Sequence, residues 1–123
     1  MTWVLVIVGA AIGAPLRYVT DRLVQQRHDS QFPWGTWTVN VAGSFLYGAL
    51  VAAQVSGHAG ANLTAVFGVG FLGALTTYST FGYETVRLVE NGAYVFALAN
   101  VGASVAAGLG AAVCGATLVN ALV

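Results

Sequence analysis

Residues 73–81 form the part of this sequence whose side chains are best suited to bind an ion. Four hydroxyl residues are interleaved there with two aromatic rings: Thr76, Thr77, Ser79 and Thr80, with Tyr78 and Phe81. No Asp, Glu, Lys or Arg occurs between residues 30 and 83. Polar groups in lipid are costly unless they are satisfied, so they tend to mark protein-lined pathways. The stretch therefore predicts a break in a membrane helix and a site that handles an ion, although hydroxyls bonded back to their own helix would give the same pattern.

The elements that must position this stretch are predicted from composition. The chain has 123 residues, of which 58% are hydrophobic and 7% charged, and its mean hydropathy is +0.79. A soluble domain averages about 25% charged residues, so we interpret residues 1–123 as one all-α integral membrane domain. A span takes about 20 apolar residues, and four spans are expected near residues 2–24, 33–53, 63–88 and 93–117. The formal net charge of zero argues against a nucleic-acid partner.

Polar residues also follow one face of the second and fourth predicted spans. Asn40 and Ser44 are four positions apart, as are Asn100 and Ser104, so each pair shares a helix face. Such residues either hydrogen-bond a neighbouring helix or donate to a passing anion, and the spans alone do not decide between these roles. Arg17 lies near the end of the first span, where it either reaches the headgroups or serves as a vestibule cation that attracts anions.

The chemical groups expected to be missing from the spans exclude several classes of function. We expect no acidic residue within the spans, with Glu84 and Arg87 marking a solvated end of the third, whereas a proton-coupled carrier needs a titratable group in the membrane. No cluster of Cys, His and carboxylates suits a metal enzyme and no nucleophile has a base at hand, so no enzyme is predicted. Neutral donors and the positive edge of the Phe81 ring favour a passive anion pore, because conduction requires binding weak enough for exit. Two rivals remain: a small proton-coupled secondary transporter and a non-conducting subunit that only packs against partners.

Three ordered motifs link these features. They are Gly9-x-x-x-Gly13-Ala-x-x-Arg17-Tyr18, Phe32-Pro33-x-Gly35-Thr36-x-x-x-Asn40-x-x-Gly43-Ser44-Phe45 and Gly70-x-x-Gly73-x-x-Thr76-Thr77-x-Ser79-Thr80-Phe81. Together with four short spans, they make the chain resemble the Fluc (CrcB) family of fluoride channels over essentially its whole length.

The resemblance implies an antiparallel dimer with two pores in the cell membrane, surrounded by lipid, that exports fluoride passively from the cytoplasm. It also implies a structural Na⁺ at the dimer centre, held by backbone carbonyls at Gly73 and Thr76. Tyr78 and Phe81 match the family's paired pore rings, the first of which is usually Phe, and Asn100 stands where the family often has Tyr. The candidate fluoride pore comprises Asn40, Tyr78, Ser79, Thr80, Phe81, Asn100 and Ser104, with Arg17 in a vestibule.

The arginines predict how the chain is oriented. With four spans, they all lie toward one side: Arg17, Arg22, Arg27 and Arg87. The other side, with both termini and the loop at His58, has no Lys or Arg. Cytoplasmic loops collect Lys and Arg, so both termini are expected to face outward. An antiparallel partner is then either a second copy of this chain or an oppositely oriented paralogue.

Overall fold

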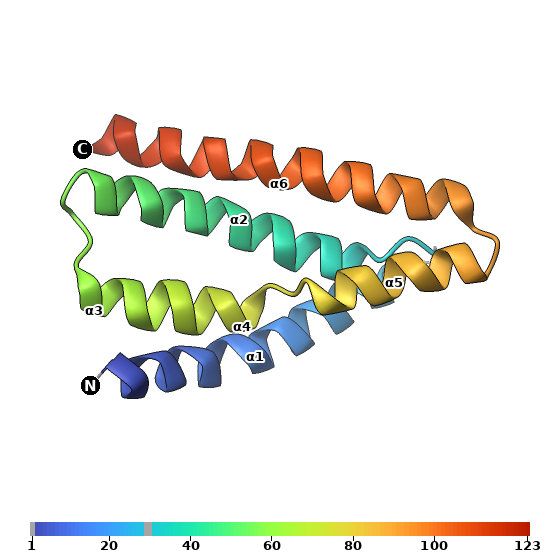
Figure 1. Cartoon of the computed structure of the whole chain (residues 1–123), viewed down its shortest axis with the longest axis horizontal. Helices are drawn as coiled ribbons and strands as arrows, with labels where there is room; N and C mark the ends of the chain where they lie inside the picture. Colours follow the sequence, from blue (N-terminus) through green and yellow to red (C-terminus); the bar gives the residue numbers. More distant parts are fainter. Residues whose placement is uncertain (1, 29–30) are drawn as a thin grey trace.

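The computed structural model describes residues 2–28 and 31–123, and within them the chain is helical with no strand (Figure 1). The elements are α1 (Thr2–Gln26), α2 (Trp34–Val55), α3 (Ala61–Leu63), the π-helix η1 (Thr64–Leu72), α4 (Gly73–Leu75), α5 (Ser79–Glu90) and α6 (Tyr94–Leu122). Segments α3, η1, α4 and α5 follow one another as a single interrupted span. The predicted all-helical class and the broken third span are confirmed.

Four segments are long and apolar enough to cross a membrane. They are Thr2–Gln26, Trp34–Val55, Ala61–Glu90 and Tyr94–Leu122, with 25, 22, 30 and 29 residues. At about 1.5 Å per residue each exceeds the roughly 30 Å of a bilayer core. The number of spans agrees with the sequence prediction, and the last two run several residues further than predicted.

Glycines bring the spans together in two tightly packed pairs. A Cβ at Gly9 or Gly70 would overlap backbone atoms across the contact between α1 and η1. A Cβ at Gly48 or Gly115 would do the same between α2 and α6. Small residues allow such backbone contact in membrane helices, where dispersion replaces the hydrophobic effect as the main attraction. The third span is therefore held against α1 by its first half.

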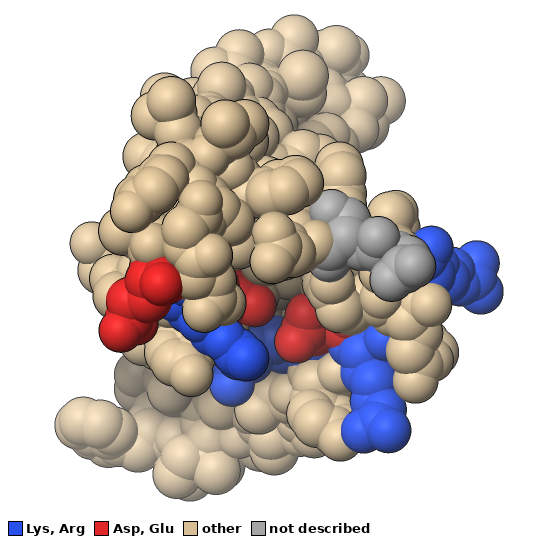
Figure 2. Space-filling model, turned by 90° about the vertical axis from the view of Figure 1, so that its right-hand side faces the viewer, with Lys and Arg blue, Asp and Glu red and all other residues tan. Residues whose placement is uncertain are grey.

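The two ends of the bundle differ in charge. Both termini and the connection from α2 to α3 lie at one end, and the connections from α1 to α2 and from α5 to α6 lie at the other (Figure 1). Figure 2 shows acidic and basic side chains gathered at this second end. The predicted separation of the arginines from the termini is confirmed as an arrangement within the chain.

Candidate functional site at the helix break

The break in the third span is short and sharply defined. Helix α4 ends at Leu75 and α5 begins at Ser79. Thr76 adopts an extended conformation, with φ −83° and ψ 160°, while its N–H still donates to the Leu72 carbonyl at 3.0 Å. The backbone thus leaves the helix after that bond and resumes it three residues later, which places irregular backbone near the middle of a span. Such backbone requires partners from neighbouring helices.

Asn40 on α2 supplies those partners. Its side-chain Nδ2 donates to the Thr77 carbonyl at 2.9 Å, and its Oδ1 accepts from the Thr77 N–H at 2.8 Å. One amide therefore satisfies both backbone groups of Thr77, a buried residue. An Asn amide carries two N–H hydrogens, so this clamp still leaves one for another acceptor. Of the two roles that the sequence left open, Asn40 has the first, because it bonds a neighbouring segment of the chain. It also lines a groove.

The clamp changes the partners of two carbonyls. In an unbroken helix the N–H of residue 77 would donate to the Gly73 carbonyl, and that of residue 80 to the Thr76 carbonyl. Here the Thr77 N–H bonds Asn40, and the Thr80 N–H donates to the Thr77 hydroxyl oxygen at 3.2 Å. Gly73 and Thr76 have therefore each lost the helical donor of their carbonyl oxygen. Such oxygens are suitable ligands for a hard cation.

The hydroxyls of the break divide into two kinds. Thr76 Oγ1 donates back to the Leu72 carbonyl at 2.9 Å, and Ser44 on α2 likewise donates to the Asn40 carbonyl at 2.7 Å. For these residues the bonding within a helix that the sequence allowed is present. Within the described residues, the Ser79 and Thr80 hydroxyls donate no hydrogen bond. Their hydrogens, like those of the Thr77 and Tyr78 hydroxyls, therefore remain for an external acceptor.

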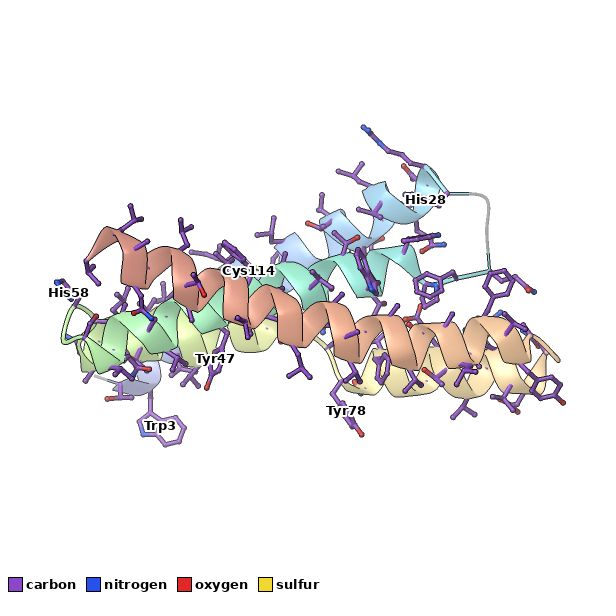
Figure 3. The ribbon with its side chains drawn as sticks, turned by 90° about the horizontal axis from the view of Figure 1, so that it is seen from above. Trp3, His28, Tyr47, His58, Tyr78 and Cys114 are labelled. Atoms are coloured by element: carbon purple, nitrogen blue, oxygen red, sulfur yellow. The ribbon has the colours of Figure 1, made fainter. Side chains whose placement is uncertain are left out.

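A groove of about 650 Å³ runs beside the break and is hereafter called the groove. Its polar and aromatic lining residues are Asn40, Ser44, Tyr47, Thr76, Thr77, Tyr78, Phe81 and Ser104. The rings of Tyr78 and Phe81 are tilted by 40° with centroids 6.3 Å apart. Figure 3 shows Tyr47 and Tyr78 projecting from the same side of the bundle, and 85% of Tyr78 is exposed. The groove is thus an open surface on one side of the chain.

A second, smaller cavity of about 180 Å³ lies toward the charged end and is hereafter called the small cavity. Its lining residues are Arg17, Tyr18, Asp21, Thr36, Val39, Thr77 and Thr80. Thr77 lines both the groove and the small cavity. The predicted vestibule residue Arg17 and the predicted pore residue Thr80 therefore belong to this second space. Ser79 is exposed and lines neither.

Asn100 lies behind the groove instead of in its wall. It is fully buried, its Nδ2 donates to Thr85 Oγ1 at 2.8 Å, and its Oδ1 accepts from Ser104 Oγ at 3.4 Å. Thr85 in turn donates to the Phe81 carbonyl at 2.8 Å. A chain of hydrogen bonds thus connects the groove residue Ser104 to the backbone of the ring residue Phe81. Sequence reasoning missed Thr85, whose only local signal is that it lies four residues after Phe81.

The expectation of acid-free spans is wrong. Asp21 lies within α1 and Glu84 within α5, and both helices belong to segments able to span a membrane. The Glu84 carboxyl lies beside Thr36, and its Oε1 is buried without a hydrogen-bond partner among the described residues. Glu84 is four residues before the buried Leu88, so it shares the inward face of α5 and is not at a fully solvated end. A lack of titratable groups in the spans therefore no longer counts against a proton-coupled transporter.

The sequence of this chain is similar to those of known proteins over nearly its whole length. The profile of a family described as "CrcB-like protein, Camphor Resistance (CrcB)" matches residues 4–116. The chain is 58% identical over 122 residues to a protein of Streptomyces avermitilis named "Fluoride-specific ion channel FluC 1", covering 99% of this chain and 98% of that one. Proteins of the same name from Frankia casuarinae and Thermobifida fusca are 54% and 50% identical, over 99% and 98% of this chain and 98% and 97% of theirs.

Proposed function

This chain belongs to the CrcB-like protein family, and on that premise we propose that it is a passive, fluoride-selective ion channel. It is a multi-pass membrane protein with four spans, in a family of ion channels, which is not an enzyme class. The observation that carries the proposal is the broken third span, which presents neutral donors and an aromatic pair beside an open groove. We further propose that fluoride leaves the cytoplasm by this route.

The groove residues suit an anion that must bind and leave again. Asn40 retains one amide hydrogen after clamping Thr77, and Phe81 offers the positive edge of its ring. The free hydroxyls of Ser79 and Thr80 extend these donors toward the charged end. None of these groups carries a full charge, so they replace part of the hydration shell without trapping the ion.

A second copy of the chain, lying antiparallel, would cover the open groove. Tyr78 is 85% exposed although it stands in the middle of a span, and Tyr47 beside it is 56% exposed. An oppositely oriented paralogue would cover the groove equally well, and the arginines at one end favour a fixed orientation with both termini outside. Single cysteines at positions 2 and 58, in a Cys114→Ala background, report the orientation in intact cells. Labelling from outside alone supports the paralogue, whereas equal labelling from both sides supports self-pairing.

Sodium is proposed as a structural ion at the centre of that dimer. Gly73 and Thr76 have each lost the helical donor of their carbonyl, and two antiparallel copies would offer four such oxygens. One chain alone provides too few oxygens for a hard cation. Replacing Na⁺ by a large organic cation should weaken dimer assembly, measured by size-exclusion chromatography, without Na⁺ moving across the membrane in a tracer assay. Assembly that is independent of Na⁺ would refute this ion.

Fluoride efflux from proteoliposomes tests the channel function. Vesicles loaded with potassium fluoride and treated with valinomycin should release fluoride, measured with an ion-selective electrode, while vesicles loaded with chloride should not release chloride. A proton-coupled transporter would instead respond to an imposed pH gradient under voltage clamp by valinomycin. A packing subunit would give no flux. Because Asp21 and Glu84 lie in the spans, the pH-gradient arm is the one that distinguishes the transporter.

A further inference from the structure

Asp21 borders the same small cavity as the break residue Thr77. It lines the small cavity with Arg17, which precedes it by one helical turn on α1. Thr77 lines this cavity as well as the groove, so the two spaces border the same buried residue at the helix break. The small cavity therefore brings Arg17 and Asp21 next to the break that borders the candidate pore.

Asp21 also stands at the first turn of α2. A Cβ at Gly35, the second residue of that helix, would overlap the Asp21 carboxylate oxygen and main-chain oxygen. The Gly35 N–H donates to Gln25 Oε1 at 3.2 Å, which holds this turn against α1. The start of a helix carries partial positive charge and attracts anions. A carboxylate of the chain itself thus lies beside this positive end of α2.

The charges around the small cavity act in opposite directions on a free anion. Arg17 and the start of α2 attract it, but Asp21 lies beside both. Glu84, whose carboxyl interacts electrostatically with Asp21, adds a second acidic group next to Thr36. We propose that Asp21 is a tethered anion that competes with fluoride for the small cavity and so limits the rate of fluoride permeation. This inference rests on the proposed function.

Removal of the Asp21 charge tests the inference. In Asp21→Asn the side chain keeps its shape, and the initial rate of fluoride efflux at a subsaturating fluoride concentration should rise by on the order of three- to tenfold, because a cleft's charge sets the local concentration of its permeant ion. The excess over the wild type should shrink as an impermeant salt is added, since the Debye length falls to about 3 Å at 1 M. Asp21→Ser removes the same charge with a smaller side chain and should also be faster.

Glu90→Gln is the matched control, because it removes one acidic charge at the same end of the bundle. Glu90 is exposed, ends α5 and lines neither the groove nor the small cavity, so its rate should equal that of the wild type. If the wild type carries no fluoride, the proposed function itself fails. If the wild type conducts but neither Asp21 variant is faster, or Glu90→Gln is accelerated equally, the role of Asp21 is overturned.

Discussion

The two halves of the third span are held in place by different interactions. Before the break, η1 packs its glycines against the backbone of α1, and Gly70 lies so close that a Cβ would come within 2.5 Å of the Val6 carbonyl oxygen. After the break, α5 is held by hydrogen bonds that involve side chains. The Thr80 N–H donates to the Thr77 hydroxyl just before α5, and Asn100 Nδ2 on α6 donates to Thr85 Oγ1. Dispersion between close backbones depends on shape, whereas hydrogen bonds depend on particular atoms. The break lies where one kind of support gives way to the other.

Gly70→Ala should have the largest effect, because Gly70 lies in η1, which is held by close packing of its backbone against α1. The new Cβ would also lie 3.1 Å from the Cα atoms of Val6 and Gly9, and backbone atoms cannot move aside singly. Overpacking typically costs about 1–3 kcal/mol and can cost more. Because the obstructing atoms here belong to the backbone of α1, we expect loss of assembled protein. The measurement is thermal unfolding in detergent.

Gly82→Ala is the comparison in the other half, where a Cβ would meet no atom within 4 Å. It should leave the melting temperature unchanged or raise it, since Ala is favoured over Gly in a helix by up to about 1 kcal/mol. If the two variants were destabilised equally, the contrast between the halves would be wrong.

Asn40→Ala should have the next largest effect, because it removes both bonds of the clamp. The N–H and carbonyl of Thr77 would be left without those partners in a buried position. Each orphaned group costs about 1–3 kcal/mol, so the loss of both should lower the unfolding free energy by about 2–6 kcal/mol. Fluoride efflux should also be lost. Asn40→Asp keeps only the acceptor and should retain part of the stability. If Asn40→Ala conducted fluoride at the wild-type rate, the two bonds from Asn40 to Thr77 would not be needed for permeation.

Phe81→Ile should stop permeation while leaving the fold intact. Phe81 lines the groove with its ring tilted against Tyr78, and an aliphatic side chain has no positive edge to offer an anion. We expect the efflux rate to fall by roughly tenfold or more. A barrier that rises by about 1.4 kcal/mol, when a fixed donor is lost from the permeation path, slows passage tenfold. Phe96→Ile on α6 removes a ring that lines neither cavity and should conduct normally.

Thr85→Val should have a smaller effect on stability, and it tests whether the hydrogen bond between Asn100 and Thr85 stabilises α5. Valine keeps the shape of threonine but offers no acceptor, so Asn100 Nδ2 would lose its partner in a fully buried site. A cost of about 1–2 kcal/mol is expected. Thr117→Val is the control, because Thr117 is exposed and bonds only the Val113 carbonyl of its own helix, at 2.7 Å. Equal melting temperatures for the two variants would show that the Asn100 bond contributes nothing.

The sequence predicted the features of this molecule that are local. The four apolar runs and a break within residues 73–81 follow from the residues of each span, and the structure places that break at residues 76–78. The collection of arginines at one end follows from the number and order of the spans. The π-helical conformation of η1 was not predicted, because its i to i+5 bonds have no signature in these residues.

Features that join distant residues were harder to predict. The clamp connects Asn40 with Thr77, 37 positions apart, and motif order placed both near the site without revealing that they bond. Asn100 was expected in the pore wall, but its bond to Thr85 buries it. Asp21 lies inside the first predicted span and Glu84 inside the third, so the predicted bounds themselves contradicted the expectation of acid-free spans. Only the position of Asp21 beside the first turn of α2 depends on the folded chain.

Tyr78→Phe should have the smallest effect, and its sign is informative. The Tyr78 hydroxyl makes no hydrogen bond within the described residues, and the side chain is 85% exposed, so its removal should leave stability unchanged. A hydroxyl donor in the path holds an anion, and weaker holding speeds exit. We therefore expect fluoride efflux to rise by about twofold to threefold, less than a single neutral hydrogen bond of about 1 kcal/mol would give. Tyr83→Phe, which removes an exposed hydroxyl on α5 away from both cavities, should leave the rate unchanged. A slower Tyr78→Phe channel would mean that the hydroxyl helps fluoride shed water as it reaches the break. Permeation past the Tyr78–Phe81 pair would then depend on the hydroxyl donor as well as on the two rings.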